Sequence, residues 1–205
     1  MPAGSSVRVA GASRDFVFVR HGETDWNRER RVQGSQGASI NDAGTEQAKA
    51  LARSLWEVPL QAVYSSALPR AVETASYVAG PHRGVTVTVD ARLNEIHHGE
   101  WEGLAEAELP DLDLYHRWRE DPTSCALPGA EPLEAVHARA IAAMRDIAVR
   151  HSASEGLVAV VSHQIVLALL KCHVLDRPWS QIRRHALAVA SYEVLTVGEG
   201  FAPRP

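Results

Sequence analysis

The sequence predicts an α/β fold, a three-layer sandwich in which a mostly parallel central sheet is flanked by helices, with a small helical lid added. Short apolar runs typical of buried strands alternate along the chain with segments of helical periodicity. Apolar residues make up 45% of the 205 residues, enough to build a sizeable core. This length fits one domain, which we expect at 15–198 with the lid at 103–130, between a flexible segment at 1–14 and a tail at 199–205.

The first half of the chain supplies three predicted strands and two predicted helices. The apolar run at 16–19, Phe-Val-Phe-Val, has the length of a short buried strand. Asn41 or Asp42 can cap a helix that reaches about residue 56, because both side chains accept hydrogen bonds from free backbone N–H groups. The other elements of this half are a strand at 62–65, a helix at 69–78 that Gly80-Pro81 ends, and a strand at 85–89.

The second half begins with the lid, where we expect two short helices at 102–110 and 112–120. A longer amphipathic helix follows at 133–149, with one apolar face formed by Leu133, Val136, Ala140, Met144 and Ile147. A central strand at 157–161, an apolar helix at 165–175 and a last strand at 191–197 complete the predicted sandwich.

Composition excludes several classes of function. The formal net charge is −4 and no block of Lys or Arg stands out, so we expect no nucleic-acid binding. No apolar run reaches 18 residues and the first 14 lack the apolar core of a signal peptide, so we expect no membrane association. Cys125 and Cys172 lie far apart and suit reduced thiols, which indicates a cytoplasmic protein. The sequence leaves open whether the protein is a monomer or a homodimer.

Residues suited to phosphate chemistry follow four of the predicted strands. The carboxyl ends of parallel strands meet at one edge of a sheet, where ligands usually bind. A neutral imidazole is a good nucleophile, and the guanidinium fork of arginine binds phosphate oxygens. The sequence therefore predicts a histidine that attacks phosphorus. In chain order the strand ends carry Arg20 and His21, then Ser65-Ser66 leading into Arg70, then Arg92 and Glu95, and last Ser162 and His163.

Each of these residues also has an ordinary structural interpretation. His21 could be a turn histidine, and Arg70 could pair with Glu73 on its own helix. Glu95 could be a solvated carboxylate, and His163 could be a histidine at the start of a helix. Their joint occurrence at four strand ends favours the functional interpretation.

A metal site is a competing interpretation of the acidic and histidine residues between 95 and 102. Ligands spaced one or two residues apart in a single loop do not form a closed coordination shell, and no second cluster completes one. We therefore expect no metal at these positions, which are Glu95, His97, His98, Glu100 and Glu102.

Five sequence blocks stand in order from about residue 16 to residue 197. They contain Arg20-His21-Gly22-Glu23-Thr24 within 18–27, Gln-Gly within 32–34, and the segments 63–75, 92–103 and 160–163. In this pattern the chain resembles the histidine phosphatase superfamily, in its phosphoglycerate mutase-like branch. It departs from the usual pattern in the loop at 37–40 and at Gln164, where family members often have glycine.

The resemblance implies a role for each matching residue. His21 would be the nucleophile that becomes phosphohistidine, while Arg20, Arg70 and His163 would bind the phosphoryl oxygens. Glu95 would be the general acid and then the base, Asn27 would add a hydrogen bond to the phosphoryl group, and Gln33 would line the pocket. The resemblance implies no cofactor and no metal.

The expected function is that of a phosphomonoesterase that hydrolyses a small phosphorylated metabolite through a phosphohistidine intermediate. The alternatives are a cofactor-dependent phosphoglycerate mutase, which uses the same intermediate, and a protein that only binds phosphorylated ligands. The lid favours the phosphatase, because its charged residues are mostly acidic and should repel a bisphosphate. These acidic residues are Glu106, Glu108, Asp111, Asp113, Glu120 and Asp121, against Arg117 and Arg119.

Overall fold

The central sheet of this computed structural model has five strands in the order β3-β2-β4-β1-β5, within the described residues 13–152 and 156–203. Strands β1 to β4 run parallel and β5 pairs antiparallel with β1. The expected mostly parallel sheet is therefore confirmed. The strands are β1 (Arg14–Arg20), β2 (Leu60–Ser65), β3 (Val87–Val89), β4 (Leu157–Ser162) and β5 (Tyr192–Val197).

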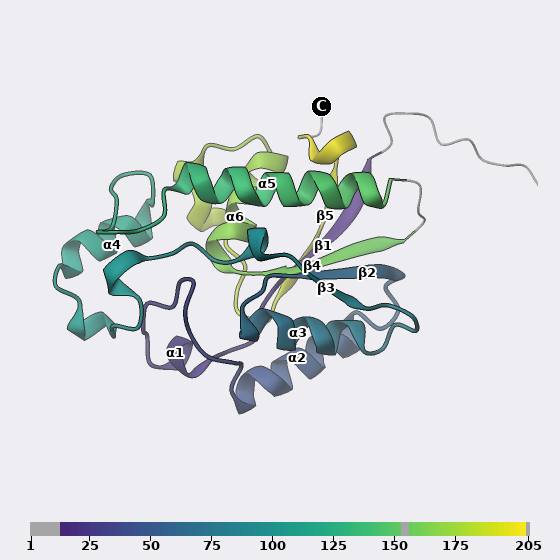
Figure 1. Ribbon diagram of the computed structural model, residues 1–205, viewed down its shortest axis with the longest axis horizontal. Coiled ribbons are helices and arrows are strands. Elements are labelled where there is room, and N and C mark those ends of the chain that lie inside the picture. Colours follow the sequence, from purple (N-terminus) through teal and green to yellow (C-terminus); the bar gives the residue numbers. More distant parts are fainter. Residues whose placement is uncertain (1–12, 153–155, 204–205) are drawn as a thin grey trace, which may run out of the picture.

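Helices cover both faces of the sheet, as Figure 1 shows. Helices α2 (Asp42–Ser54) and α3 (Pro69–Ala79) pack on one face, and α5 (Leu133–Arg150) and α6 (Gln164–Val174) pack on the other. Successive side chains of a strand point to opposite faces, so β1 contributes to both layers of the core. Phe16 and Phe18 pack with α5 and α6, while Val17 and Val19 pack with α2 and α3.

Local signals placed most helices correctly. The side chain of Asn41 caps α2 by accepting a hydrogen bond from the backbone of Gly44 at 2.8 Å. Pro69 occupies the first turn of α3, where its missing N–H costs nothing. A short helix, α1 (Asp25–Arg28), was not expected; Thr24 and Asn27 form a reciprocal cap at its start.

The lid contains one of the two helices expected there. Helix α4 (Leu112–Glu120) is confirmed, and Trp118 anchors it in the core. The expected helix at 102–110 is wrong, because only a 3-10 turn at Glu106–Glu108 forms. Gly103 has a φ of +86°, which no helix allows, and it packs against the ring of Trp26.

The packed structure extends beyond the expected boundary at residue 198. Phe201 lies in a 3-10 turn, is fully buried, and meets the rings of Phe16 and Phe18 at centroid distances of 5.7 and 6.3 Å. At the other end β1 begins at Arg14, so nearly all of the expected segment at 1–14 lies outside the described residues. None of the helices formed by 13–152 and 156–203 is long and apolar enough to span a membrane.

Candidate active site

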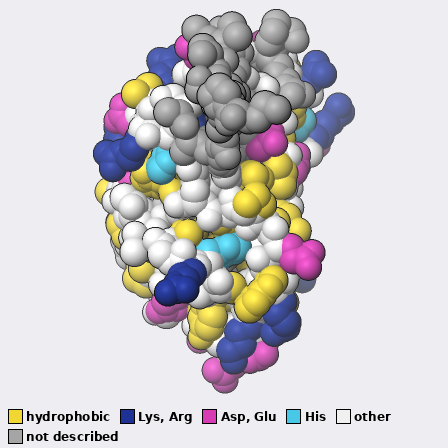
Figure 2. All heavy atoms as spheres, turned by 90° about the vertical axis from the view of Figure 1, so that its right-hand side faces the viewer, with side chains coloured by type: hydrophobic (Ala, Val, Ile, Leu, Met, Phe, Trp, Pro, Cys, Tyr) yellow, Lys and Arg dark blue, Asp and Glu magenta, His cyan; other side chains and the backbone are white. Residues whose placement is uncertain are grey.

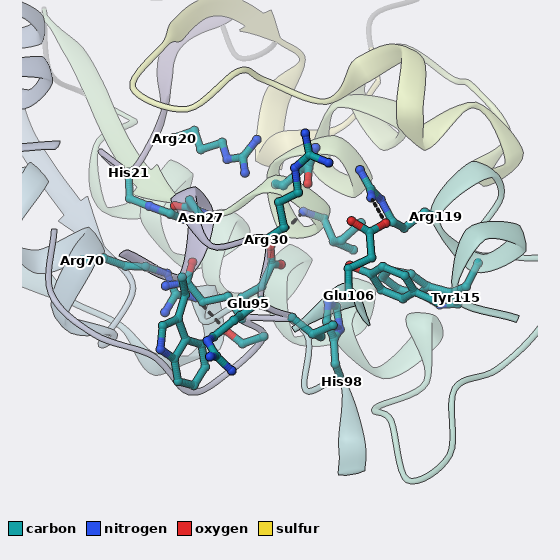
Figure 3. Close-up of a pocket in the computed structure, with 18 of the residues that line it drawn as sticks. Arg20, His21, Asn27, Arg30, Arg70, Glu95, His98, Glu106, Tyr115 and Arg119 are labelled. Carbon is teal, nitrogen blue, oxygen red and sulfur yellow. Dashed lines mark hydrogen bonds and ion pairs between the residues drawn. The ribbon is translucent and has the colours of Figure 1, made fainter. Parts of the chain in front are cut away.

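A cavity of about 500 Å³ opens at the carboxyl ends of the parallel strands. Six of the seven predicted site residues line it, namely Arg20, His21, Asn27, Gln33, Arg70 and Glu95 (Figure 3). The seventh, His163, does not line the cavity but lies beside His21, with the two ring centroids 5.1 Å apart. The structure therefore brings these seven residues together.

His21 follows β1 and is held in one orientation by its neighbour. Its Nδ1 lies 2.7 Å from the carbonyl oxygen of Gly22. A carbonyl oxygen can only accept, so Nδ1 carries the proton and Nε2 keeps the free electron pair in the neutral ring. The residue lines the cavity although it is only 3% exposed. Burial lowers the pKa of His21 well below its usual value, and the charges of Arg70 and Arg20 lower it further.

Arg20 and Arg70 are held by uncharged acceptors. Arg20 donates to the carbonyl of Leu187 at 2.8 Å. Arg70, at the start of α3, donates to the carbonyls of Gln36 and Gly34 at 2.8 and 2.6 Å. Within the described part of the chain neither guanidinium forms an ion pair, and the Nε of each is buried without a hydrogen-bond partner. Both positive charges therefore remain available to an anion.

Burial is the main influence on the pKa of Arg70 and lowers it to about 10, so the group stays charged at neutral pH. The alternative pairing of Arg70 with Glu73 does not occur. The carboxylate of Glu73 instead accepts a hydrogen bond from the backbone N–H of Ile40 at 3.0 Å.

Glu95 lies in the loop after β3, where its carboxylate faces the start of α6. It accepts hydrogen bonds from the N–H groups of Ile165 and Val166 at 3.2 and 3.4 Å. Burial raises the pKa of Glu95 despite these bonds, which favours a carboxyl group that can donate a proton. Arg92, in the same loop, turns away from the cavity and pairs with Asp90 and Asp146.

His163 follows β4 and is completely buried. Its Nε2 lies 2.7 Å from the hydroxyl of Ser66, which directly follows β2. Its Nδ1 is buried without a partner in the structure. Burial lowers the pKa of His163 well below its usual value, followed by the charges of Arg70 and His21. Ser66 is thus a partner of the second histidine, a role that sequence reasoning did not assign.

Asn27 and Gln33 are linked through the buried hydroxyl of Thr24. This hydroxyl accepts from the N–H of Asn27 at 3.2 Å and from Nε2 of Gln33 at 2.8 Å. It donates to Oδ1 of Asn27 at 3.1 Å, which leaves the amide nitrogen of Asn27 free to donate to a ligand. The motif residue Thr24 therefore orients two predicted ligand-binding side chains.

Comparison with known proteins decides the family. The sequence profile of the histidine phosphatase superfamily, branch 1, matches residues 16–202. The chain belongs to this superfamily.

Curated relatives cover most of this histidine phosphatase. Phosphoserine phosphatase 1 of Hydrogenobacter thermophilus is 31% identical over 186 residues, which are 90% of this chain and 87% of the relative. Phosphoglycerate mutase-like protein 4 of Arabidopsis thaliana is 36% identical over 160 residues, 76% of this chain and 69% of the relative. Among solved structures, mycobacterial glucosyl-3-phosphoglycerate phosphatase has a TM-score of 0.79 and 31% identity, and the match covers 90% of this chain and 91% of that one. The family, the fold class and the assignment as a phosphatase are confirmed.

Sequence reasoning missed a second group of basic residues in the pocket of this histidine phosphatase. The cavity is also lined by Arg30, Arg31, Arg119 and Arg183. No local signal pointed to them, because they come from three separate segments and follow no motif. The expected repulsion of a bisphosphate by the acidic lid gains no support from this lining, because Glu106 is the one acidic lid residue among the cavity residues that the structure describes. Most acidic lid residues face solvent, among them Asp111, Asp113 and Glu120, and Glu108 pairs with Arg31.

The carboxylate of Glu102 organises the loop that holds Arg70. It accepts from the N–H groups of Ser35 and Gln36 at 2.6 and 3.2 Å, and from that of His98 at 2.9 Å. The side chain is 1% exposed. In residues 13–152 and 156–203 no three His, Cys, Asp or Glu side chains converge as metal ligands, so the alternative metal interpretation of this loop has no support there.

Proposed function

We propose that this protein is a phosphomonoesterase that hydrolyses a small phosphorylated metabolite through a phosphohistidine on His21. The observation that supports this most directly is the arrangement around the free Nε2 of that residue. Two arginines without ion pairs, Arg20 and Arg70, line the same cavity, and a buried carboxyl group of raised pKa, Glu95, lines it too (Figure 3).

In the first step Nε2 of His21 attacks phosphorus and the bond to the ester oxygen breaks. The guanidinium groups of Arg20 and Arg70 stabilise the negative charge on the phosphoryl oxygens. Glu95 donates its proton to the departing oxygen, so the product leaves as an alcohol. The hydrogen bond from Nδ1 to the carbonyl of Gly22 keeps the ring in the tautomer that this attack requires.

In the second step water attacks the phosphohistidine and inorganic phosphate is released. The carboxylate of Glu95 removes a proton from the water, which restores its acid form, and His21 recovers its electron pair. The covalent intermediate divides one difficult hydrolysis into two easier steps. Asn27 adds a hydrogen bond to the phosphoryl group, and His163 adds one from Nδ1, because its Nε2 is bonded to Ser66. No metal ion takes part.

The protein acts in the cytoplasm in this proposal. Its two cysteines, Cys125 and Cys172, are free thiols in the structure, which suits a reducing compartment.

The experiment that tests this function measures phosphate release from a panel of phosphomonoesters and traps the intermediate with ³²P-labelled substrate by acid or base quench. We expect an acid-labile, base-stable phosphoenzyme that His21→Ala abolishes together with turnover. His82→Ala, at the far end of α3, is the matched control and should retain both. A label on a serine or aspartate would contradict the mechanism.

Phosphoglycerate mutase activity is the second candidate, since the arginine-rich pocket could accept a bisphosphate. Both activities share the phosphohistidine, and they differ in whether water or a substrate hydroxyl takes the phosphoryl group. Supplying 2,3-bisphosphoglycerate and following 2- and 3-phosphoglycerate separates them. Interconversion faster than phosphate release would favour the mutase.

A further inference from the structure

The active-site cavity has a second basic region apart from the residues around His21. Three arginines form it, here called the outer arginines: Arg30 after α1, Arg119 on α4, and Arg183 in the 3-10 segment Trp179–His185. Figure 3 shows Arg119 beside Glu106 and Tyr115, with His21 at the other side of the pocket and Arg30 between them.

The charges in the cavity exceed what one phosphate ester would balance. Six arginines and two glutamates, Glu95 and Glu106, line it. Arg31 is neutralised by Glu29 and Glu108 at 2.8 and 3.2 Å. The single phosphoryl group of a monoester carries at most two negative charges, and Arg20 and Arg70 are placed to bind them.

Few carboxylates neutralise the positive charge of the outer arginines. Glu106 is shared between Arg119, at 3.1 Å, and His116, at 3.2 Å. Neither Arg30 nor Arg183 forms an ion pair or side-chain hydrogen bond with any residue that the structure describes.

Arg183 lies within reach of the positive charge of another outer arginine. It is partly buried, and both this burial and the neighbouring charge of Arg119 lower its pKa. Like charges in a partly desolvated site repel one another, and an anion between them would relieve the repulsion. A guanidinium fork matches a carboxylate or a phosphate group.

The cavity also has room for a substrate larger than the phosphoryl group. Its volume is about 500 Å³, and its walls include the aromatic side chains of Trp26, Tyr115 and Trp118. Such a volume falls within the range of pockets that bind whole metabolites. A substrate bound with its phosphoryl group at His21 would extend toward the outer arginines.

We infer that the substrate is a phosphate monoester with a second anionic group, a carboxylate or a second phosphate, which the outer arginines bind. This inference rests on the proposed phosphatase function of the same site. Arg183 and Arg30 are then specificity-determining residues. Arg119 also adds positive charge to the site of the second anionic group, although it is paired with Glu106.

A matched pair of esters tests the inference. 3-Phosphoglycerate and glycerol 3-phosphate carry the phosphate on the same carbon and differ in a carboxylate against a hydroxymethyl group. We expect kcat/KM to be about 10- to 100-fold higher for the carboxylate ester, the effect of one or two charge-assisted hydrogen bonds. Fructose 1,6-bisphosphate against fructose 6-phosphate tests a second phosphate in the same role, because neither compound has a carboxylate. A preference for the ester with the second anionic group in either pair supports the inference, and the pair that shows it identifies which anion the site takes.

Variants of the outer arginines identify the site. In the double variant Arg183→Gln with Arg30→Gln, the ratio of kcat/KM for 3-phosphoglycerate to kcat/KM for glycerol 3-phosphate should fall toward one. Arg184→Gln is the matched control, because its side chain is exposed, adjacent in sequence and outside the cavity, and the ratio should stay at the wild-type value. A wild-type ratio near one in both pairs of esters, or a ratio unchanged in the double variant, would overturn the inference.

p-Nitrophenyl phosphate separates this inference from the proposed function. If the wild-type protein hydrolyses this compound but shows no preference for esters with a second anionic group, the inference fails and the proposed phosphatase function stands. Failure to hydrolyse any ester, this one included, would remove both.

Discussion

At the scale of single residues, burial sets the chemistry of the two reacting groups. It lowers the pKa of His21 and raises that of Glu95, so the imidazole stays neutral and the carboxyl group keeps its proton to higher pH than an exposed glutamate does. Opposite shifts in two neighbouring titratable groups are the pattern expected of a nucleophile and its general acid.

Glu95→Gln should separate leaving groups by their need for a proton. The amide keeps the size of the side chain but cannot donate the proton that a sugar alkoxide requires. We expect kcat for sugar phosphates to fall by ~10²–10⁴, and the loss for p-nitrophenyl phosphate to be much smaller. Steady-state kinetics on both substrates checks this, and equal losses would mean that Glu95 is not the leaving-group acid.

The dependence of turnover on pH should also reveal the role of Glu95. Because burial raises the pKa of Glu95 above its usual value near 4.5, its acid form persists to higher pH. Turnover of a sugar phosphate should therefore fall as the pH rises through this pKa, since the acid form is lost. In Glu95→Gln this descending limb should disappear. A wild-type profile whose descending limb survives in the variant would assign that limb to another group.

At the scale of elements, Arg139 connects α5 to the loop that carries Glu95. Its guanidinium donates to the carbonyls of Arg92, Asn94 and Glu95 at 2.8, 2.5 and 3.2 Å. The same group pairs with Glu131 at 2.8 and 2.9 Å. In the proposed mechanism Arg139 is thus a positioning residue, which acts on Glu95 through the backbone.

Arg139→Gln should loosen this loop and lower turnover of sugar phosphates by up to ~10²-fold, the scale that a misplacement of about 1 Å produces. The loss on p-nitrophenyl phosphate should be smaller, and the effect should not add to that of Glu95→Gln, because both act on one proton transfer. Arg145→Gln, exposed on the same helix, is the control. Additive losses in the double variant would indicate a role independent of Glu95.

Glu102 holds the loop at 34–36, whose carbonyl oxygens accept hydrogen bonds from Arg70. Glu102→Gln replaces one acceptor oxygen with an NH₂ group, which then faces either the N–H groups of Ser35 and His98 or the N–H group of Gln36. We expect a stability loss of about 1–3 kcal/mol from the unpaired buried groups. Inhibition by inorganic phosphate should also weaken, because the loop carbonyls that hold Arg70 move. Urea unfolding and the inhibition constant measure both, and Glu100→Gln, an exposed neighbour, should change neither. Unchanged stability would contradict this role.

At the scale of the whole molecule, positive charge is concentrated at the pocket of a chain whose formal net charge is −4. On the face in Figure 2, which lies away from α4, basic and acidic side chains are interspersed among hydrophobic and other groups. The electrostatic stabilisation that phosphoryl transfer needs can therefore come from side chains at the site.

Activity should consequently survive exhaustive treatment with EDTA. Arg20 and Arg70 would supply the charge that a metal ion supplies in other phosphatases. Phosphate release before and after chelation measures this, with a Zn²⁺-dependent phosphatase as the control for the treatment. Activity lost to EDTA and restored by Mg²⁺ or Zn²⁺ would overturn the prediction.

Much of this architecture follows from short stretches of sequence. The apolar run at 16–19 determined β1, Asn41 and Pro69 determined where α2 and α3 begin, and the residues after each strand indicated His21, Arg70, Glu95 and His163. These features depend on neighbours within a few residues, such as a cap or an apolar run, and on the rule that parallel strands present their carboxyl ends together.

Only the tertiary structure decided the rest. Gly103 has a φ of +86° that rules out the expected helix at 102–110, and Phe201 joins the core through two rings of β1. Arg30 and Arg183 line one cavity although about 150 residues separate them. Burial, which shifts the pKa of His21 and Glu95, is likewise a property of the packed molecule. Local pattern determines elements and their ends, whereas contacts between distant segments exist only once the sheet has brought those segments together.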